Sequence, residues 1–131
     1  MDYTPSALTI AKINAGFGLM GFGLSYCAPE MQIAQLDWKP KDMKLARYLT
    51  TFAGQHDVPW AVMSLLAVKS GVVSKDYMLA SAIYGGFLTV DIVARVMPQC
   101  EEVGIDKKKV MPYVPILAFV GIASFLRWKQ M

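Results

Sequence analysis

The residues best suited to chemistry are a polar run, Gln55-His56-Asp57, and a later pair, Asp91 and Arg95. Both sets lie within long apolar stretches, where an ionisable group is costly and by default marks a pathway, a proton relay or a partner. A histidine beside a carboxylate could move protons, and Asp91 and Arg95 share a helix face because they are four residues apart. The sequence therefore predicts an intramembrane polar cluster of Gln55, His56, Asp57, Asp91 and Arg95.

This cluster lacks the other parts of a catalytic or cofactor site. It has no obvious nucleophile, no second histidine for haem or a metal, and no Glu-x-x-His pair of a di-iron bundle. The two cysteines have no C-x-x-C or histidine-paired spacing. We expect no catalytic, cofactor-binding or metal-binding residue, and structural lipids as the only bound molecules. Three interpretations stay open: mutual pairing that holds helices together or lies near the interface, a transport or proton role, and a component of a membrane redox enzyme.

Composition places the chain in a membrane. Of its 131 residues, 55% are hydrophobic, above the 45–50% that is usual in soluble domains. These residues are gathered into long blocks with few charges, which is the pattern of membrane-crossing helices. The net charge of +3 comes from basic residues scattered among acidic ones, which argues against nucleic acid as a partner. We predict an all-α fold, an integral membrane four-helix bundle that forms a single domain over residues 1–131.

Four apolar blocks define the expected helices, at about residues 7–28, 43–70, 76–97 and 110–128. The first is long enough for one crossing and ends before Pro29, and the third ends before Pro98. The fourth closes with Arg127, Trp128 and Lys129, which suit the membrane interface. The second is the weakest crossing, because the polar run at residues 55–57 interrupts it and Pro59 favours a kink. We expect loops at residues 30–42 and 101–109.

The first block carries a stripe of small or polar residues at helical spacing. In lipid, helices associate through close backbone approach, which small side chains permit. We therefore predict that this stripe packs against another helix. Its members are Ala7, Ala11, Asn14, Gly18, Gly21 and Ser25.

Four crossings place both termini on one side of the membrane and the two longer loops on the other. The eight basic residues on the side of the longer loops are Lys39, Lys41, Lys44, Arg47, Arg95, Lys107, Lys108 and Lys109. The four on the opposite side are Lys69, Lys75, Arg127 and Lys129. Eight against four predicts that the longer loops face the interior. Cys27 and Cys100 would then lie near a reducing compartment as free thiols.

The run Ala53-Gly54-Gln55-His56-Asp57, together with Asp91, resembles the small DoxX-like four-helix membrane proteins. In that family the second helix typically carries a Gly-x-Arg-Asp or Gly-x-Arg-Asn element and the third a buried aspartate. Gly54, Asp57 and Asp91 match this pattern, whereas His56 replaces the arginine and Ala61 stands where a glycine is common. The resemblance covers most of the chain. It implies a four-helix bundle and, for some members, association with redox complexes of the membrane.

These features favour a non-catalytic accessory subunit of a multisubunit organellar membrane complex. The stripe, the missing catalytic set and the mild basicity point to the mitochondrial inner membrane, as a multi-pass subunit of the respiratory chain or ATP synthase. Its expected partners are other membrane subunits and phospholipids. The alternative is a small DoxX-like transporter, or a quinone- or lipid-interacting membrane protein, that uses His56, Asp57 and Asp91.

Overall fold

The computed structural model describes residues 3–131, and within them the chain is all-helical with no β-strand. This confirms the all-α class. The elements in chain order are α1 (Ala7–Gly21), the π-helical segment η1 (Phe22–Cys27), α2 (Pro29–Gln35), α3 (Met43–Ser70), α4 (Lys75–Asp91), the π-helical segment η2 (Ile92–Val96), α5 (Met97–Val103), α6 (Lys107–Val110) and α7 (Tyr113–Gln130).

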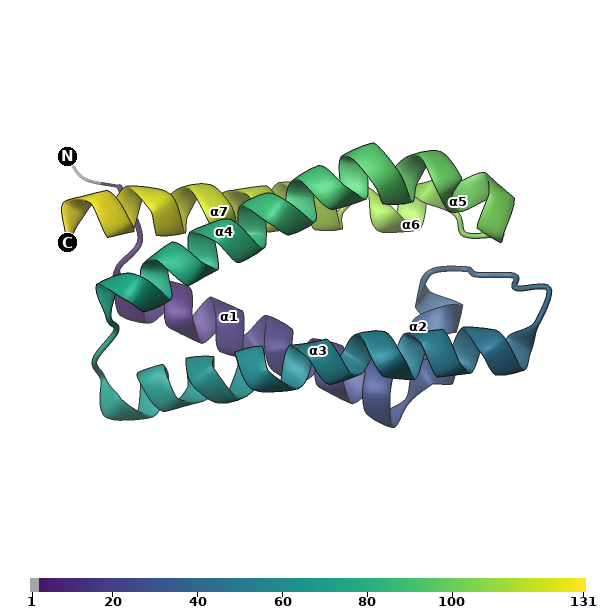
Figure 1. Cartoon of the computed structure of the whole chain (residues 1–131), viewed down its shortest axis with the longest axis horizontal. Coiled ribbons are helices and arrows are strands. Elements are labelled where there is room, and N and C mark those ends of the chain that lie inside the picture. The colour runs from purple at the N-terminus through teal and green to yellow at the C-terminus, as the bar shows by residue number, and fades with distance from the viewer. Residues whose placement is uncertain (1–2) are drawn as a thin grey trace.

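The long helices form two antiparallel pairs, α1 with α3 and α4 with α7 (Figure 1). The start of α1 and the end of α7 lie at one end of the molecule, and α2, α5 and α6 lie at the other. The two pairs are joined at that second end by the segment after α2, where Lys39 N–H donates to Gly104 O at 2.8 Å and Trp38 Nε1–H donates to Val103 O at 2.7 Å.

Local sequence explains where α3 and α4 begin and end. Asp42 caps α3 by accepting from Leu45 N–H at 3.0 Å, and Ser74 caps α4 by accepting from Tyr77 N–H at 3.0 Å. Gly71 ends α3 with φ +69°, the left-handed conformation that glycine adopts without strain. Pro59 lies inside α3, which continues on both sides of it.

The predicted loops at residues 30–42 and 101–109 are partly helical in the structure, so both predictions were wrong in part. Residues 29–35 are helical because Pro29 occupies the first turn of α2 and Glu30 suits its N-terminus. The third helix does not end before Pro98 but continues to Val103, because Pro98 sits in the first turn of α5, directly after η2. A π-helical turn changes the hydrogen-bond ladder there, so the missing proline N–H is tolerated. Asp106 caps the short α6 within the expected second loop.

Three helical segments among the described residues are long and apolar enough to cross a membrane: Ala7–Cys27, Lys75–Val103 and Lys107–Gln130. The 28-residue α3 is not one of them, because the run Gln55-His56-Asp57 lowers the hydropathy of its middle. These three segments identify the chain as a membrane protein. The surface of the bundle is also that of a membrane protein, because large apolar side chains on the long helices are exposed. Among them are Leu19, Phe52, Leu66, Phe87 and Ile122.

Candidate functional site

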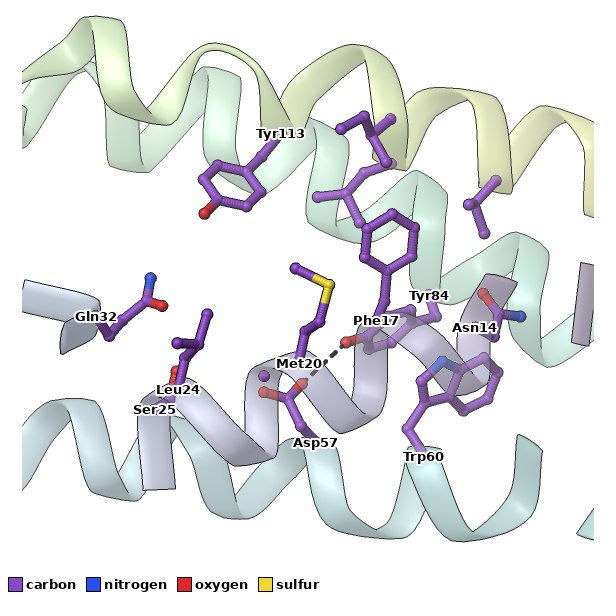
Figure 2. Close-up of a pocket in the computed structure, with 14 residues that line it drawn as sticks. Asn14, Phe17, Met20, Leu24, Ser25, Gln32, Asp57, Trp60, Tyr84 and Tyr113 are labelled. Atoms are coloured by element: carbon purple, nitrogen blue, oxygen red, sulfur yellow. Dashed lines mark hydrogen bonds between the residues drawn. The ribbon is translucent and has the colours of Figure 1, made fainter. Parts of the chain in front are cut away.

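A cavity of about 220 Å³ lies between the two helix pairs (Figure 2). Side chains from α1, η1, α2, α3, α4 and α7 line it, so it exists only once all four long helices are assembled. The lining residues are Asn14, Phe17, Met20, Gly21, Leu24, Ser25, Gln32, Asp57, Trp60, Tyr84, Tyr113, Ile116, Leu117 and Val120.

Asp57 is the one charged residue that lines this cavity. Its carboxylate accepts a long hydrogen bond, 3.4 Å, from the Tyr84 hydroxyl of α4 (Figure 2). The carboxylate also lies against the backbone of α1 at Gly21, where an added Cβ would collide with it. A glycine at position 21 is therefore what allows the carboxylate to occupy this place.

An aromatic stack forms one wall of the cavity. The Trp60 indole lies between the Tyr77 and Tyr84 rings, with centroid distances of 5.4 and 4.9 Å. Such offset stacks add stability beyond the area that they bury. Trp60 Nε1 is shielded from solvent and has no hydrogen-bond partner among the described residues. A shielded N–H without an acceptor is unfavourable, and the stacking contacts of the indole offset this cost.

The cavity opens sideways between α1 and α7. Met20, Tyr113 and Ile116 line this side and remain 57, 38 and 40% exposed. Figure 2 shows Met20 and the Tyr113 ring facing each other across the space. A molecule could thus reach the cavity from the apolar surroundings of the bundle without passing through its ends.

A chain of buried hydrogen bonds closes the cavity at the end nearer the termini. Asn14 Nδ2 donates to Ser81 Oγ at 2.8 Å and to Tyr77 Oη at 3.2 Å. Ser64 Oγ lies 2.7 Å from Tyr77 Oη, and Ser81 Oγ lies 2.7 Å from Ser124 Oγ. The chain joins α3, α4, α1 and α7, and interhelical bonds of this kind hold membrane bundles together.

The structure divides the polar cluster expected from the sequence. Asp57 turns into the cavity, whereas Gln55 and His56 are exposed on the opposite face of α3, and His56 Nδ1 lies 3.1 Å from Phe52 O. Asp91 pairs with Arg95 at 2.8 Å. Among the described residues, no hydrogen bond or ion pair joins Asp57 to that pair. Because neighbouring residues on a helix point about 100° apart, residues 55 to 57 do not share one face.

The second half of the small-residue stripe, Gly18, Gly21 and Ser25, lies against α3, whereas Asn14 bonds to α4. Ala11, Asn14 and Gly18 are buried. A Cβ on Gly18 would lie 2.8 Å from the Ala61 Cα, so the two backbones are in direct contact there. Further along, Ser25 meets Gly54, whose added Cβ would lie 2.9 Å from the Ser25 Cβ. Only glycine permits this approach at positions 18 and 54.

Sequence reasoning missed three aromatic residues of the site, Trp60, Tyr84 and Tyr113. For Trp60 a signal existed, because it follows Asp57 by three residues and therefore shares its helix face. Tyr84 and Tyr113 come from other helices, and no local pattern marks them. The described residues hold no group of three or more histidine, cysteine or acidic side chains suited to a metal ion, and Cys27 and Cys100 are free thiols.

Comparison with known proteins finds no matching family model, curated protein or solved structure. The DoxX-like resemblance thus stays a prediction.

Proposed function

We propose that this chain is a four-crossing membrane protein that binds a small amphipathic molecule in the cavity between its helix pairs. The observation that carries the proposal is the cavity itself, because its walls are apolar apart from a few polar groups, including the Asp57 carboxylate and the Tyr84 hydroxyl. Ligand sites in proteins have this composition. This proposal develops the interpretation of the chain as a transporter or as a lipid- or quinone-interacting protein. The binding group is Asp57 alone instead of the whole polar cluster.

A fourth crossing by α3 is part of the proposal. The inward face of α3 carries small residues, Ala46, Thr50, Gly54, Ala61 and Ser64, all buried. Its outward face carries large apolar residues such as Phe52, Met63 and Leu66, which are exposed. This distribution suits a helix that packs on one side and meets lipid on the other. Asp57 of the polar middle faces the cavity, whereas Gln55 and His56 are exposed, so a crossing by α3 requires water or a partner chain beside these two residues.

Both the ligand cavity and the fourth crossing can be tested by fluorescence in lipid vesicles. The protein used carries Trp38→Phe and Trp128→Phe, so that Trp60 is its single tryptophan. Bromine-labelled octanol should quench Trp60 saturably, because it fills a finite site. Lipids brominated at mid-chain should quench Trp60 more than lipids brominated near the head group, because Trp60 lies near the middle of α3.

The matched control keeps Trp128 alone, at the end of α7 outside the cavity lining. There, octanol quenching should rise linearly without saturation. Linear quenching of Trp60 as well would refute the cavity as a binding site. Stronger quenching from the head-group position would refute the fourth crossing.

An accessory subunit of a mitochondrial inner-membrane complex is the second candidate. It is favoured by an apolar groove of about 510 Å³ on the outer face of α4 and α7, where Gly86 has open space around its Cβ position. Small residues beneath a groove let a partner's transmembrane helix approach closely. In this case the groove would hold such a helix from another subunit.

Filling that groove with Gly86→Leu tests the second candidate. In native gels of mildly solubilised membranes, the wild-type chain should migrate with a large complex and the variant mostly alone. The variant's own fold is checked by its unfolding temperature. Migration of the wild-type chain as a monomer would contradict the subunit hypothesis.

A further inference from the structure

The electrostatics of the cavity narrow the class of molecule that it accepts, given that the proposed function holds. The lining includes one carboxylate, that of Asp57, and no lysine, arginine or histidine. The neighbouring His56 points to the outside, and Arg95 is paired with Asp91 away from the lining. Among the described residues, no lysine, arginine or histidine forms an ion pair with Asp57, although the exposed His56 beside it interacts with the carboxylate electrostatically.

An isolated carboxylate in an apolar cavity is unfavourable, because the protein interior solvates charge poorly. Its one hydrogen bond in the structure, from Tyr84, is long at 3.4 Å. Gly21, which leaves room for the carboxylate beside α1, keeps it at the cavity surface. The negative charge of the Asp57 carboxylate is therefore not balanced by an ion pair, and it lies at a defined position in the cavity.

The cavity that holds this carboxylate is also lined by aromatic rings. Phe17, Tyr84 and Tyr113 line the same cavity, from α1, α4 and α7, and Figure 2 shows the Tyr84 hydroxyl directed at the carboxylate. Aromatic faces attract organic cations, and aromatic cages with a carboxylate are suited to substituted ammonium groups. A metal cation is a poorer fit, because its usual oxygen cage would need several carboxylate or carbonyl ligands.

The lateral opening of the cavity indicates the chemistry of the remaining part of the ligand. Met20 and Ile116 give the opening an apolar rim, so an alkyl chain could extend through it toward lipid while the charged group stays inside. We propose that the cavity binds amphipathic organic cations, with the ammonium group at Asp57 and the apolar tail toward the opening between α1 and α7.

Displacement of bromine-labelled octanol from the protein that keeps Trp60 alone tests this proposal. The competitors are a short-chain alkyltrimethylammonium ion and its uncharged counterpart, in which carbon replaces the nitrogen. The cation should displace the probe at a concentration about tenfold or more below that of the uncharged compound, because it gains both ion pairing and ring contacts.

Asp57→Asn should remove this preference, so that the two competitors become equivalent, while Asp91→Asn should retain it. Asparagine keeps the size of the side chain, and circular dichroism of both variants confirms that they are folded. Equal displacement by the two competitors in the wild-type protein would overturn the cation preference and leave the ligand cavity intact. Absence of saturable quenching by the octanol probe itself would instead remove the proposed function.

Discussion

Gly85→Ala is expected to lower the free energy of unfolding by about 1–3 kcal/mol, the usual cost of overpacking a closely packed site. A Cβ at position 85 would lie 2.6 Å from the Gly121 N and 2.9 Å from the Leu117 O. Both atoms belong to the backbone of α7, so no side chain can rotate away. The helices α4 and α7 would have to separate, and their contact is the most extensive in the molecule.

The next residue provides the matched control for this substitution. Gly86 has no atom within 4 Å of its Cβ position, so Gly86→Ala adds a methyl group into open space. Because alanine is favoured over glycine within helices by about 1 kcal/mol, this variant should be as stable as the wild type or more so. Both substitutions have the same chemical composition, and only the position of the new methyl group differs.

Unfolding in mixed micelles, followed by circular dichroism over a denaturant titration, measures both variants. We expect the transition of Gly85→Ala at a lower denaturant concentration than that of the wild type, and the transition of Gly86→Ala at the same or a higher one. Equal stability of the two variants would mean that α4 and α7 do not meet through Gly85 and Gly121. The pairing of helices described above would then be incorrect.

Helix positions in this chain follow largely from local sequence, whereas the site does not. The four apolar blocks could be located from their length and their flanking prolines, and in the structure Ser6, Asp42 and Ser74 cap helices and Gly71 ends one. The stripe of α1 could also be found, because small residues recur at helical spacing. Its partner helix could not, since Ala61 and Gly54 lie far along the chain and carry no mark of which helix they face.

The cavity depends on how the two helix pairs are inclined, which no single segment encodes. The sequence showed that burying the charge of Asp57 in a membrane is energetically unfavourable. Its grouping with Asp91 and Arg95, however, assumed that the polar side chains of the bundle bind to one another. In the structure Arg95 reaches outward, 75% exposed, and satisfies Asp91 within its own helix. Asp57 meets Tyr84 instead, a residue that no sequence pattern marks. Long-range aromatic contacts thus decide the site, and helical periodicity does not.

Gly21→Ala is expected to abolish the cation preference while leaving the fold intact. The new Cβ would collide with the carboxylate of Asp57, which is the end of a side chain and can rotate out of the way. The helix preference of alanine, about 1 kcal/mol over glycine, opposes the close approach of the new Cβ to the Asp57 Cβ at 3.3 Å, so the net change in stability should be small. The displaced carboxylate would leave the position that faces the cavity and the Tyr84 hydroxyl, so the ammonium group would lose its partner.

Close charge pairs in desolvated binding sites have coupling energies of about 1.5 kcal/mol or more, so we expect the affinity for an alkyltrimethylammonium ion to fall by about tenfold to a hundredfold. Gly23→Ala is the matched control, since nothing lies within 4 Å of that Cβ position. The displacement assay with the protein that keeps Trp60 alone measures both variants. If Gly21→Ala bound the cation as tightly as Gly23→Ala, the ammonium group would not be held by the carboxylate of Asp57 at this position, and the charge preference of the cavity would need another source.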